Sequence, residues 1–166
     1  MMRLLGLDPG LRRTGWGVVD FDGVRLGYVA SGTIAPDPDR PIADRLVDLH
    51  DGLRQVIADW RPDTAAVEET FVNRNAASAL KLGQARGVVL LAPALAGLDV
   101  AEYHNRAVKL AVVGTGRAAK QQVGLMVRTL LPRSAPDSED AADALAVAIC
   151  HAHYSASPRR LAGAVA

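Results

Sequence analysis

The sequence predicts an α/β domain in which helices cover both faces of a five-stranded mixed sheet. Two observations carry this prediction. Three strand-like segments joined by short turns open the chain, and two further strand-like segments follow, each preceded by a helical segment. Strands joined by tight turns pair antiparallel, whereas strands separated by a helix pair parallel. The chain of 166 residues has the length of one such domain.

The first three strands are predicted at residues 3–8, 14–20 and 24–34. The first is a short apolar run that ends at Asp8, where Pro9-Gly10 breaks it. Asp22-Gly23 is a tight hairpin signal, so these strands should form an antiparallel meander. Prolines 36, 38 and 41 then interrupt the regular structure.

The remaining elements alternate between helix and strand. Apolar residues recur at helical spacing from Ile42 to Trp60, and Pro62-Asp63 stops this helix before a short strand that ends in acid. Pro93 and Gly97 lie near the end of the next helix and predict a kink or a frayed last turn. After residues 42–60, we expect strands at 64–68 and 99–103 and helices at 75–98, 106–113, 117–131 and 138–154. We assign residues 1–154 to one domain and 155–166 to a flexible tail.

Composition narrows the function classes. The formal net charge is only +1, so bulk charge alone does not mark a nucleic-acid-binding protein. Cys150 is the single cysteine of the chain, which excludes an internal disulfide, and its apolar surroundings predict a buried side chain. The apolar run before Asp8 is too short for a secretory signal, and no run reaches the length of a membrane span. We therefore expect a soluble, cytoplasmic protein.

Four carboxylates occupy positions that favour catalysis. Asp8 and Glu68 end two predicted strands, and Asp140 and Asp143 lie three residues apart on the last helix, where they share one side. Functional groups collect at the carboxyl ends of parallel strands, so the helix need only bring its acids to that edge. Carboxylates without clustered Cys or His predict Mg²⁺ or Mn²⁺, and a pair of such ions hydrolyses phosphodiesters.

Each acid also has an ordinary structural interpretation. Asp8 before Pro-Gly suits a turn, and Asp140 suits the first turn of a helix capped by Ser138. Asp143 is flanked by small residues that allow close packing, so it is harder to explain without a partner. Glu68 and Glu69 compete for one role, because successive strand residues face opposite sides. Periodicity leaves that choice open.

Five motifs, in the same order along residues 3 to 153, resemble the RuvC family of Holliday-junction resolvases. They are Leu5-Gly-Leu-Asp-Pro-Gly10 with Thr14-Gly-Trp-Gly17, Val67-Glu-Glu-Thr-Phe71, Ser78-Ala-Leu-Lys-Leu-Gly-Gln-Ala-Arg-Gly87, Lys109 with Val112-Val-Gly-Thr-Gly116, and Asp140-Ala-Ala-Asp-Ala-Leu-Ala146. The resemblance implies a ribonuclease H-like fold and a bacterial, homodimeric endonuclease that makes paired nicks in four-way DNA junctions. It also implies action with the RuvA–RuvB branch-migration complex.

The resemblance also assigns residues. It implies that Asp8, Glu68, Asp140 and Asp143 are the catalytic, metal-binding acids, and so favours Glu68 over Glu69. Phe71 would stack on bases at the crossover, although a core or helix-start Phe is the structural alternative. The glycines and alanines of the helix from Asn75 would allow close approach in a dimer. Basic residues expected at the DNA are Arg74, Lys81, Arg106, Lys109, Arg117 and Lys120, each of which is otherwise an ordinary surface charge.

Two rival functions remain to be separated. An actin-like or sugar-kinase-like ATPase also opens with a strand-terminal Asp-x-Gly, but such proteins duplicate the fold and 166 residues cannot hold two halves. A non-catalytic junction-binding module would have no reason to keep four mutually repelling acids. The histidines at 50, 104, 151 and 153 are assigned structural roles, since His151 and His153 diverge on a helix.

Overall fold

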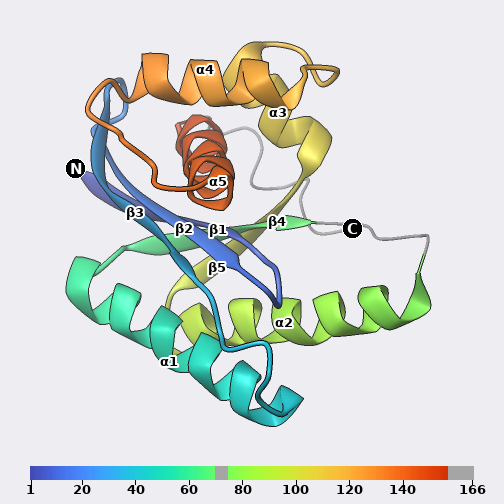
Figure 1. The fold of residues 1–166 in the computed structure, drawn as a ribbon. Coiled ribbons are helices and arrows are strands. Elements are labelled where there is room, and N and C mark those ends of the chain that lie inside the picture. The colour runs from blue at the N-terminus through green and yellow to red at the C-terminus, as the bar shows by residue number, and fades with distance from the viewer. Residues whose placement is uncertain (70–74, 157–166) are drawn as a thin grey trace.

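The computed structural model describes residues 1–69 and 75–156 of the chain. Within them, five strands form one sheet in the order β3-β2-β1-β4-β5 (Figure 1). Their bounds are β1 Met2–Asp8, β2 Thr14–Phe21, β3 Leu26–Ile34, β4 Thr64–Glu69 and β5 Asp99–His104. β1 pairs antiparallel with β2 and β2 with β3, whereas β1 pairs parallel with β4 and β4 with β5. The predicted mixed sheet is confirmed.

The helices cover the two faces of the sheet, as predicted. α1 and α2 lie on one face, and α3, α4 and α5 lie on the other (Figure 1). In the described residues, the helices are α1 Ile42–Trp60, α2 Ala76–Leu95, α3 Asn105–Val113, α4 Lys120–Leu130 and α5 Glu139–Ser155. No helix in this part of the chain is long and apolar enough to cross a lipid bilayer.

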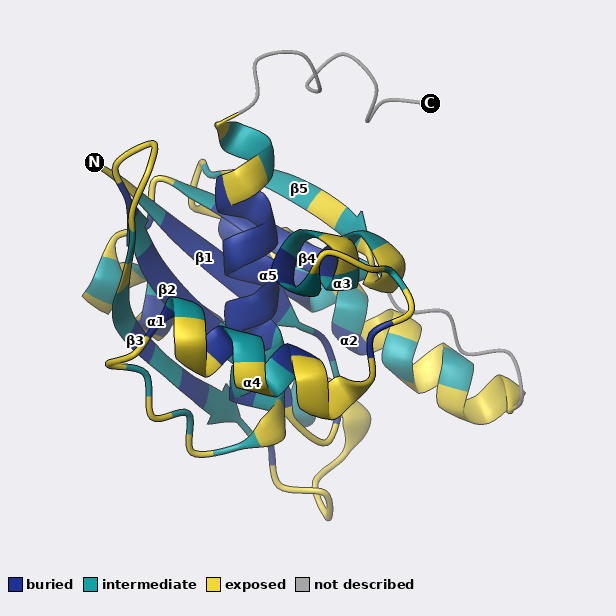
Figure 2. Cartoon of the chain, turned by 90° about the horizontal axis from the view of Figure 1, so that it is seen from above, coloured by how far each residue is buried: buried dark blue, intermediate teal, exposed yellow. Residues whose placement is uncertain are grey.

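Two hydrophobic clusters fill the spaces between the sheet and its helices. Side chains alternate along β1, so Leu4 packs on the α5 side while Leu5 and Leu7 pack against α1 and α2. α5 is the most deeply buried helix, and Figure 2 shows it dark along most of its length. Because α5 packs across the centre of the sheet, the position of its first two turns relative to the strands is fixed.

The helix predicted at residues 117–131 begins three residues later, at Lys120. Gly114 ends α3 with a positive φ of 89°, and residues 115–119 form turns before the chain becomes helical again. Gln122 then accepts a hydrogen bond from the backbone N–H of Ala119 through its side-chain oxygen, at 2.8 Å. This side-chain cap sets the first residue of α4, a position that apolar spacing alone does not define.

The helix predicted to run to about Leu98 ends at Leu95, and its last turn is closed rather than frayed. Gly97 has a positive φ of 80°, its N–H bonds to the carbonyl of Ala94, and the N–H of Leu98 bonds to the carbonyl of Pro93. These two bonds form a Schellman motif, which satisfies the final carbonyl groups of a helix. At its other end, the Asn75 side chain caps α2 by accepting from Ser78 N–H.

Candidate active site

Asp8 and Glu68 lie side by side at the carboxyl edge of the sheet. β1 and β4 are parallel, and Leu7 is in register with Val67, so the next residues of the two strands are Asp8 and Glu68. Both side chains lie on the same side of the sheet as Leu4 and Ala66, and this side is covered by α5. The strand pairing therefore fixes both carboxylates before any ligand is present.

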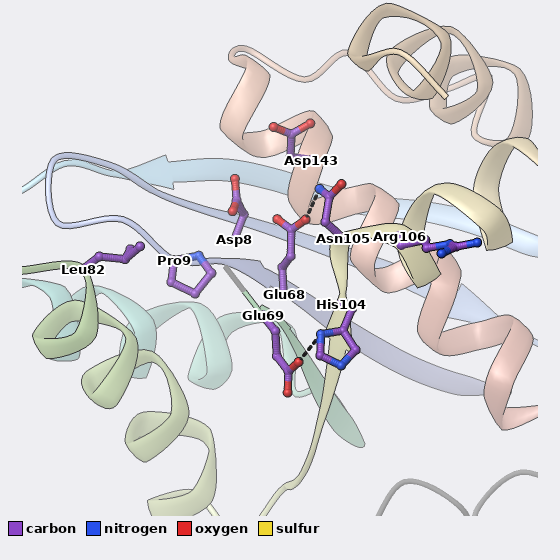
Figure 3. Close-up of a pocket in the computed structure, with 9 residues that line it drawn as sticks. All are labelled: Asp8, Pro9, Glu68, Glu69, Leu82, His104, Asn105, Arg106 and Asp143. Carbon is purple, nitrogen blue, oxygen red and sulfur yellow. Dashed lines mark hydrogen bonds and ion pairs between the residues drawn. The ribbon is translucent and has the colours of Figure 1, made fainter. Parts of the chain in front are cut away.

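The register also separates Glu68 from Glu69. Glu68 is 9% exposed and accepts a hydrogen bond from Asn105 Nδ2 at 2.6 Å. Glu69 points away from the acids and contacts His104, with 2.5 Å between Oε2 and Nδ1 (Figure 3). The geometry puts Glu68, and not Glu69, beside Asp8.

Glycines on the central strands bring α5 close enough to deliver Asp143. A Cβ atom on Gly6 would lie 2.1 Å from the carbonyl oxygen of Ala144, and one on Gly15 would lie 2.0 Å from that of Asp140. Only residues without a Cβ allow the helix backbone to lie this close to the sheet. Ser138 caps the helix by accepting from Ala141 N–H at 3.1 Å, so α5 starts one turn before the acid it delivers.

The carboxylates line one open cavity of about 560 Å³ (Figure 3). Its described lining is Asp8, Pro9, Glu68, Glu69, Leu82, His104, Asn105, Arg106 and Asp143. Asp140 lies outside this lining, one helical turn before Asp143, although its charge acts on Asp8. No group of three or more acidic, His or Cys side chains in residues 1–69 and 75–156 is already arranged to hold one metal ion.

Like charges and burial dominate the electrostatics of the cavity. Burial, followed by the charges of Glu68 and Asp143, raises the pKa of Asp8 to about 8. Burial also raises the pKa of Asp143, while Lys120 opposes that shift. Lys120 Nζ lies 3.1 Å from both Asp143 and Glu139, and these bonds raise the lysine's own pKa. The site thus concentrates negative charge around an open hollow.

The basic residues predicted to contact DNA occupy different positions. Arg106 lines the cavity, and Lys120 reaches its Asp143 wall. Arg117 is exposed between α3 and α4, Lys109 lies on α3, and Lys81 is exposed on α2. Phe71 and Arg74 fall outside the described residues.

Three residues near the acids were not singled out by the sequence analysis for the site. Asn105 bonds Glu68, Glu139 shares Lys120 with Asp143, and His104, predicted to be structural, lines the cavity. His104 directly follows Tyr103, the last apolar residue of its strand, and Asn105 comes next, which is close to the signal that identified Asp8. Applied to 99–103, that signal would have found them.

Comparison with known proteins agrees with this geometry. The fold and site define an α/β protein of the ribonuclease H-like class with acids at the carboxyl ends of its central strands. The family model described as crossover junction endodeoxyribonuclease RuvC matches residues 4–151, and the chain belongs to this RuvC family.

Individual relatives cover nearly the whole chain. A crossover junction endodeoxyribonuclease RuvC of Paramagnetospirillum magneticum is 65% identical over 99% of both chains. A structure of Thermus thermophilus RuvC in complex with Holliday junction substrate is 38% identical, with a TM-score of 0.87 over 94% of this chain and 96% of that one. A yeast mitochondrial Holliday junction resolvase shares only the fold, at 11% identity and a TM-score of 0.65 over 93% of this chain and 81% of that one.

Proposed function

We propose that the chain is a divalent-metal-dependent endonuclease that resolves four-way DNA junctions by paired, symmetric nicks in recombination and repair. The observation that carries this proposal is the gathering of Asp8, Glu68 and Asp143 around one open cavity in a member of the RuvC family. The likeness to a RuvC structure in complex with Holliday junction substrate supports the choice of DNA.

The side chains around the cavity fit a hard divalent cation. They offer carboxylate oxygens from Asp8, Glu68 and Asp143, while the single cysteine, Cys150, is buried in α5. Such oxygen donors suit Mg²⁺ or Mn²⁺ rather than zinc. The raised pKa of Asp8 supports the same conclusion, since a bound cation offsets the burial and the like charges that raise it. We therefore propose Mg²⁺, replaceable by Mn²⁺, at two ions per site with Asp140 as a fourth ligand.

Mg²⁺ held by Asp8, Glu68 and Asp143 would supply an activated water and positive charge for the leaving 3′ oxygen, so hydrolysis would leave 5′-phosphate and 3′-hydroxyl ends. The protein's own contribution is to fix the ligands. Asp8 and Glu68 sit on paired strands, and Lys120 holds Asp143 through its ion pair. Lys120 also keeps a positive charge beside the acids, where it attracts the phosphate group of an approaching strand.

A rim of basic side chains supports binding of the DNA backbone. Arg106 at the cavity and Lys109, Arg117 and Lys120 on or beside α3 and α4 would neutralise phosphates, and Lys81 on α2 would extend the contact. Binding should weaken steeply as salt concentration rises, because neutralised phosphates release counterions. Phe71 and Arg74 belong to this proposal through the family resemblance.

Two equivalent sites in a homodimer match the two equivalent strands of a junction. α2 carries exposed leucines at 80, 91 and 95, and a Cβ added to Gly83 or Gly87 would meet open space, so this helix offers an apolar surface with room for close approach. Closed two-fold assembly is the commonest oligomeric arrangement. We propose dimerisation through α2, and action beside RuvA and RuvB in a bacterial cytoplasm.

Cleavage of synthetic junctions tests the proposal. A mobile and an immobile four-way junction, labelled on each strand, should give symmetric nicks that require Mg²⁺ or Mn²⁺. Asp8→Asn, Glu68→Gln, Asp140→Asn and Asp143→Asn should each abolish cleavage and leave junction binding in EDTA intact, because removing a negative charge does not weaken attraction to DNA. Binding without nicking by the wild type would favour a non-catalytic module.

Glu69→Gln is the matched control for Glu68→Gln, because the two residues are adjacent on β4 and face opposite sides. It should nick the junction at a rate close to that of the wild type. An inactive Glu69→Gln beside an active Glu68→Gln would reverse the assignment.

Phe71→Ala should reduce cleavage without changing the melting temperature. Cleavage by this variant at the wild-type rate would count against base stacking.

A further inference from the structure

Glu68 is hydrogen-bonded by a neutral side chain, that of Asn105. Asn105 Nδ2 donates to Glu68 Oε1 at 2.6 Å, and Figure 3 shows the amide beside Glu68 on the side away from Glu69. Asn105 is the first residue of α3 and follows β5, whose Tyr103 is in register with Glu68. The bond therefore joins the carboxyl ends of two neighbouring parallel strands.

Asn105 does not serve its helix as an ordinary capping residue. Asparagine at a helix start usually accepts a backbone N–H through its side-chain oxygen. The capping position of α3 is His104, which makes no side-chain cap hydrogen bond. The amide of Asn105 is instead directed to Glu68, which is almost fully buried, whereas Asn105 itself is exposed at the cavity mouth.

The chemistry of an amide donor suits a carboxylate that must still accept a cation. Asn105 donates to Oε1 of Glu68 without cancelling the negative charge of this carboxylate, which also faces Asp8 and helps to raise the pKa of Asp8. A lysine or arginine there would also orient the carboxylate, but it would add a positive charge beside Glu68. The neighbouring acid, Asp143, is held in this other way, by Lys120. Ligand carboxylates are commonly oriented by such outer hydrogen bonds.

We propose that Asn105 is a positioning residue that keeps Glu68 turned toward Asp8 and preorganises it as a metal ligand. This inference rests on the proposed metal site. It predicts that losing the amide weakens cation binding while the fold and the DNA affinity stay unchanged.

The test measures Mn²⁺ alone binding to the full chain, by calorimetry and by the electron paramagnetic resonance signal of free Mn²⁺. Asn105→Ala should bind Mn²⁺ on the order of tenfold more weakly, the usual loss for an outer hydrogen bond to a ligand. Its cleavage should need correspondingly more metal and recover at high concentration. Asn105→Gln, which keeps the amide, should lie between Ala and wild type.

Gln55→Ala is the matched control, because the side-chain amide of Gln55 also donates to a carboxylate, that of Asp59, at 2.7 Å on the exposed side of α1. It should bind Mn²⁺ as the wild type does. The melting temperature without metal and junction binding in EDTA should be the same for Asn105→Ala and wild type. Should Asn105→Ala misfold, Asn105→Leu keeps the volume without the donor and replaces it.

Wild-type Mn²⁺ affinity in a folded Asn105→Ala or Asn105→Leu would overturn the inference and leave the proposed function standing. Equal weakening in Gln55→Ala would also overturn it, since the effect would then not be local to Glu68. A wild-type chain that binds no Mn²⁺ would overturn the proposed metal site and this inference together.

Discussion

Helix α5 presents ionisable side chains to the same sheet near both of its ends, but in different environments. Near its start, Asp143 lines an open cavity with Asp8 and Glu68. Near its end, His151 is 7% exposed, with Nδ1 2.8 Å from the Tyr103 hydroxyl and Nε2 3.2 Å from Thr64 Oγ1. Burial raises the pKa of Asp143 and lowers that of His151 to about 4.

The hydrogen bonds at the His151 end define one tautomer. Thr64 Oγ1 donates its proton to the carbonyl of Asp99 at 2.9 Å, so it can only accept from His151. Nε2 therefore carries the proton, and Nδ1 accepts from Tyr103. A neutral, fully bonded histidine stabilises the fold, whereas crowded acids around a hollow store repulsion that a ligand can relieve. The same helix thus carries a structural end and, at the proposed active site, a functional end.

The largest effect is expected from a substitution that displaces the first turn of α5 and leaves its His151 end in place. Gly15→Val would drive a side chain into the α5 backbone at Asp140, where even a Cβ atom would lie 2.0 Å from the carbonyl oxygen. Overpacking against backbone should cost about 3 kcal/mol. Thermal unfolding should show a loss on the order of 10 °C in melting temperature, together with loss of cleavage.

Gly124→Ala is the control for this substitution. Gly124 lies within α4, and a Cβ there would meet no atom within 4 Å. Alanine has a higher helix propensity than glycine, and its methyl group would meet no neighbour here, so the substitution should stabilise the protein by about 0.5–1 kcal/mol. If Gly15→Val melted like the wild type, the close packing of α5 on β2 would be wrong.

A smaller effect is expected at the functional end. The pKa of Asp8 is raised above its unfolded value of 3.8 to about 8, so its charged form opposes folding increasingly as the pH rises between these values. Asp8→Asn should stabilise the metal-free protein at pH 8 by about 0.5–2 kcal/mol, although it abolishes cleavage. Urea unfolding in EDTA measures this gain.

Mg²⁺ should stabilise the wild type against urea and stabilise Asp8→Asn much less, because the substitution removes a proposed metal ligand. A lower stability of Asp8→Asn in EDTA would show that Asp8 serves the fold, as a turn residue would. That result would remove the functional distinction between the two ends of α5.

Local patterns predicted most of the fold from the sequence. The apolar run that ends at Asp8, the Asp22-Gly23 turn and the helical spacing from Ile42 to Trp60 depend on neighbouring residues, and the structure confirms all three elements. The exact start of α4 depended on a side-chain cap by Gln122, and the end of α2 depended on the φ angle of Gly97. Such single contacts are not visible in periodicity.

The candidate site was predictable in part for the same reason. Asp8 and Glu68 end strands, and strand order places such residues at one edge. The sequence could not choose between Glu68 and Glu69 until the register related β4 to β1. It also could not show that Gly15 lets α5 approach, or that Asn105 reaches Glu68, because both contacts join remote segments.

The smallest expected effect concerns the structural end and its response to acid. Neutral His151 has a folded pKa of about 4 against 6.5 when unfolded, so the unfolded chain takes up the proton first as the pH falls. His151 should therefore leave stability unchanged above about pH 6.5 and reduce it progressively between pH 6.5 and pH 4. From pH 7.5 to pH 5.5 the expected loss is about 1 kcal/mol, measured by urea unfolding across this range.

His151→Gln isolates this contribution, because Asp8 titrates with the opposite sign: its raised pKa makes the folded state gain stability as the pH falls. The variant should be less stable than the wild type at pH 7.5, since Gln cannot reproduce the geometry of both hydrogen bonds of the ring. The difference between the two proteins should shrink toward pH 5.5, where only the wild type loses the histidine contribution. A difference that stays constant with pH would mean that His151 titrates normally in the folded protein and that the end of α5 is open to water.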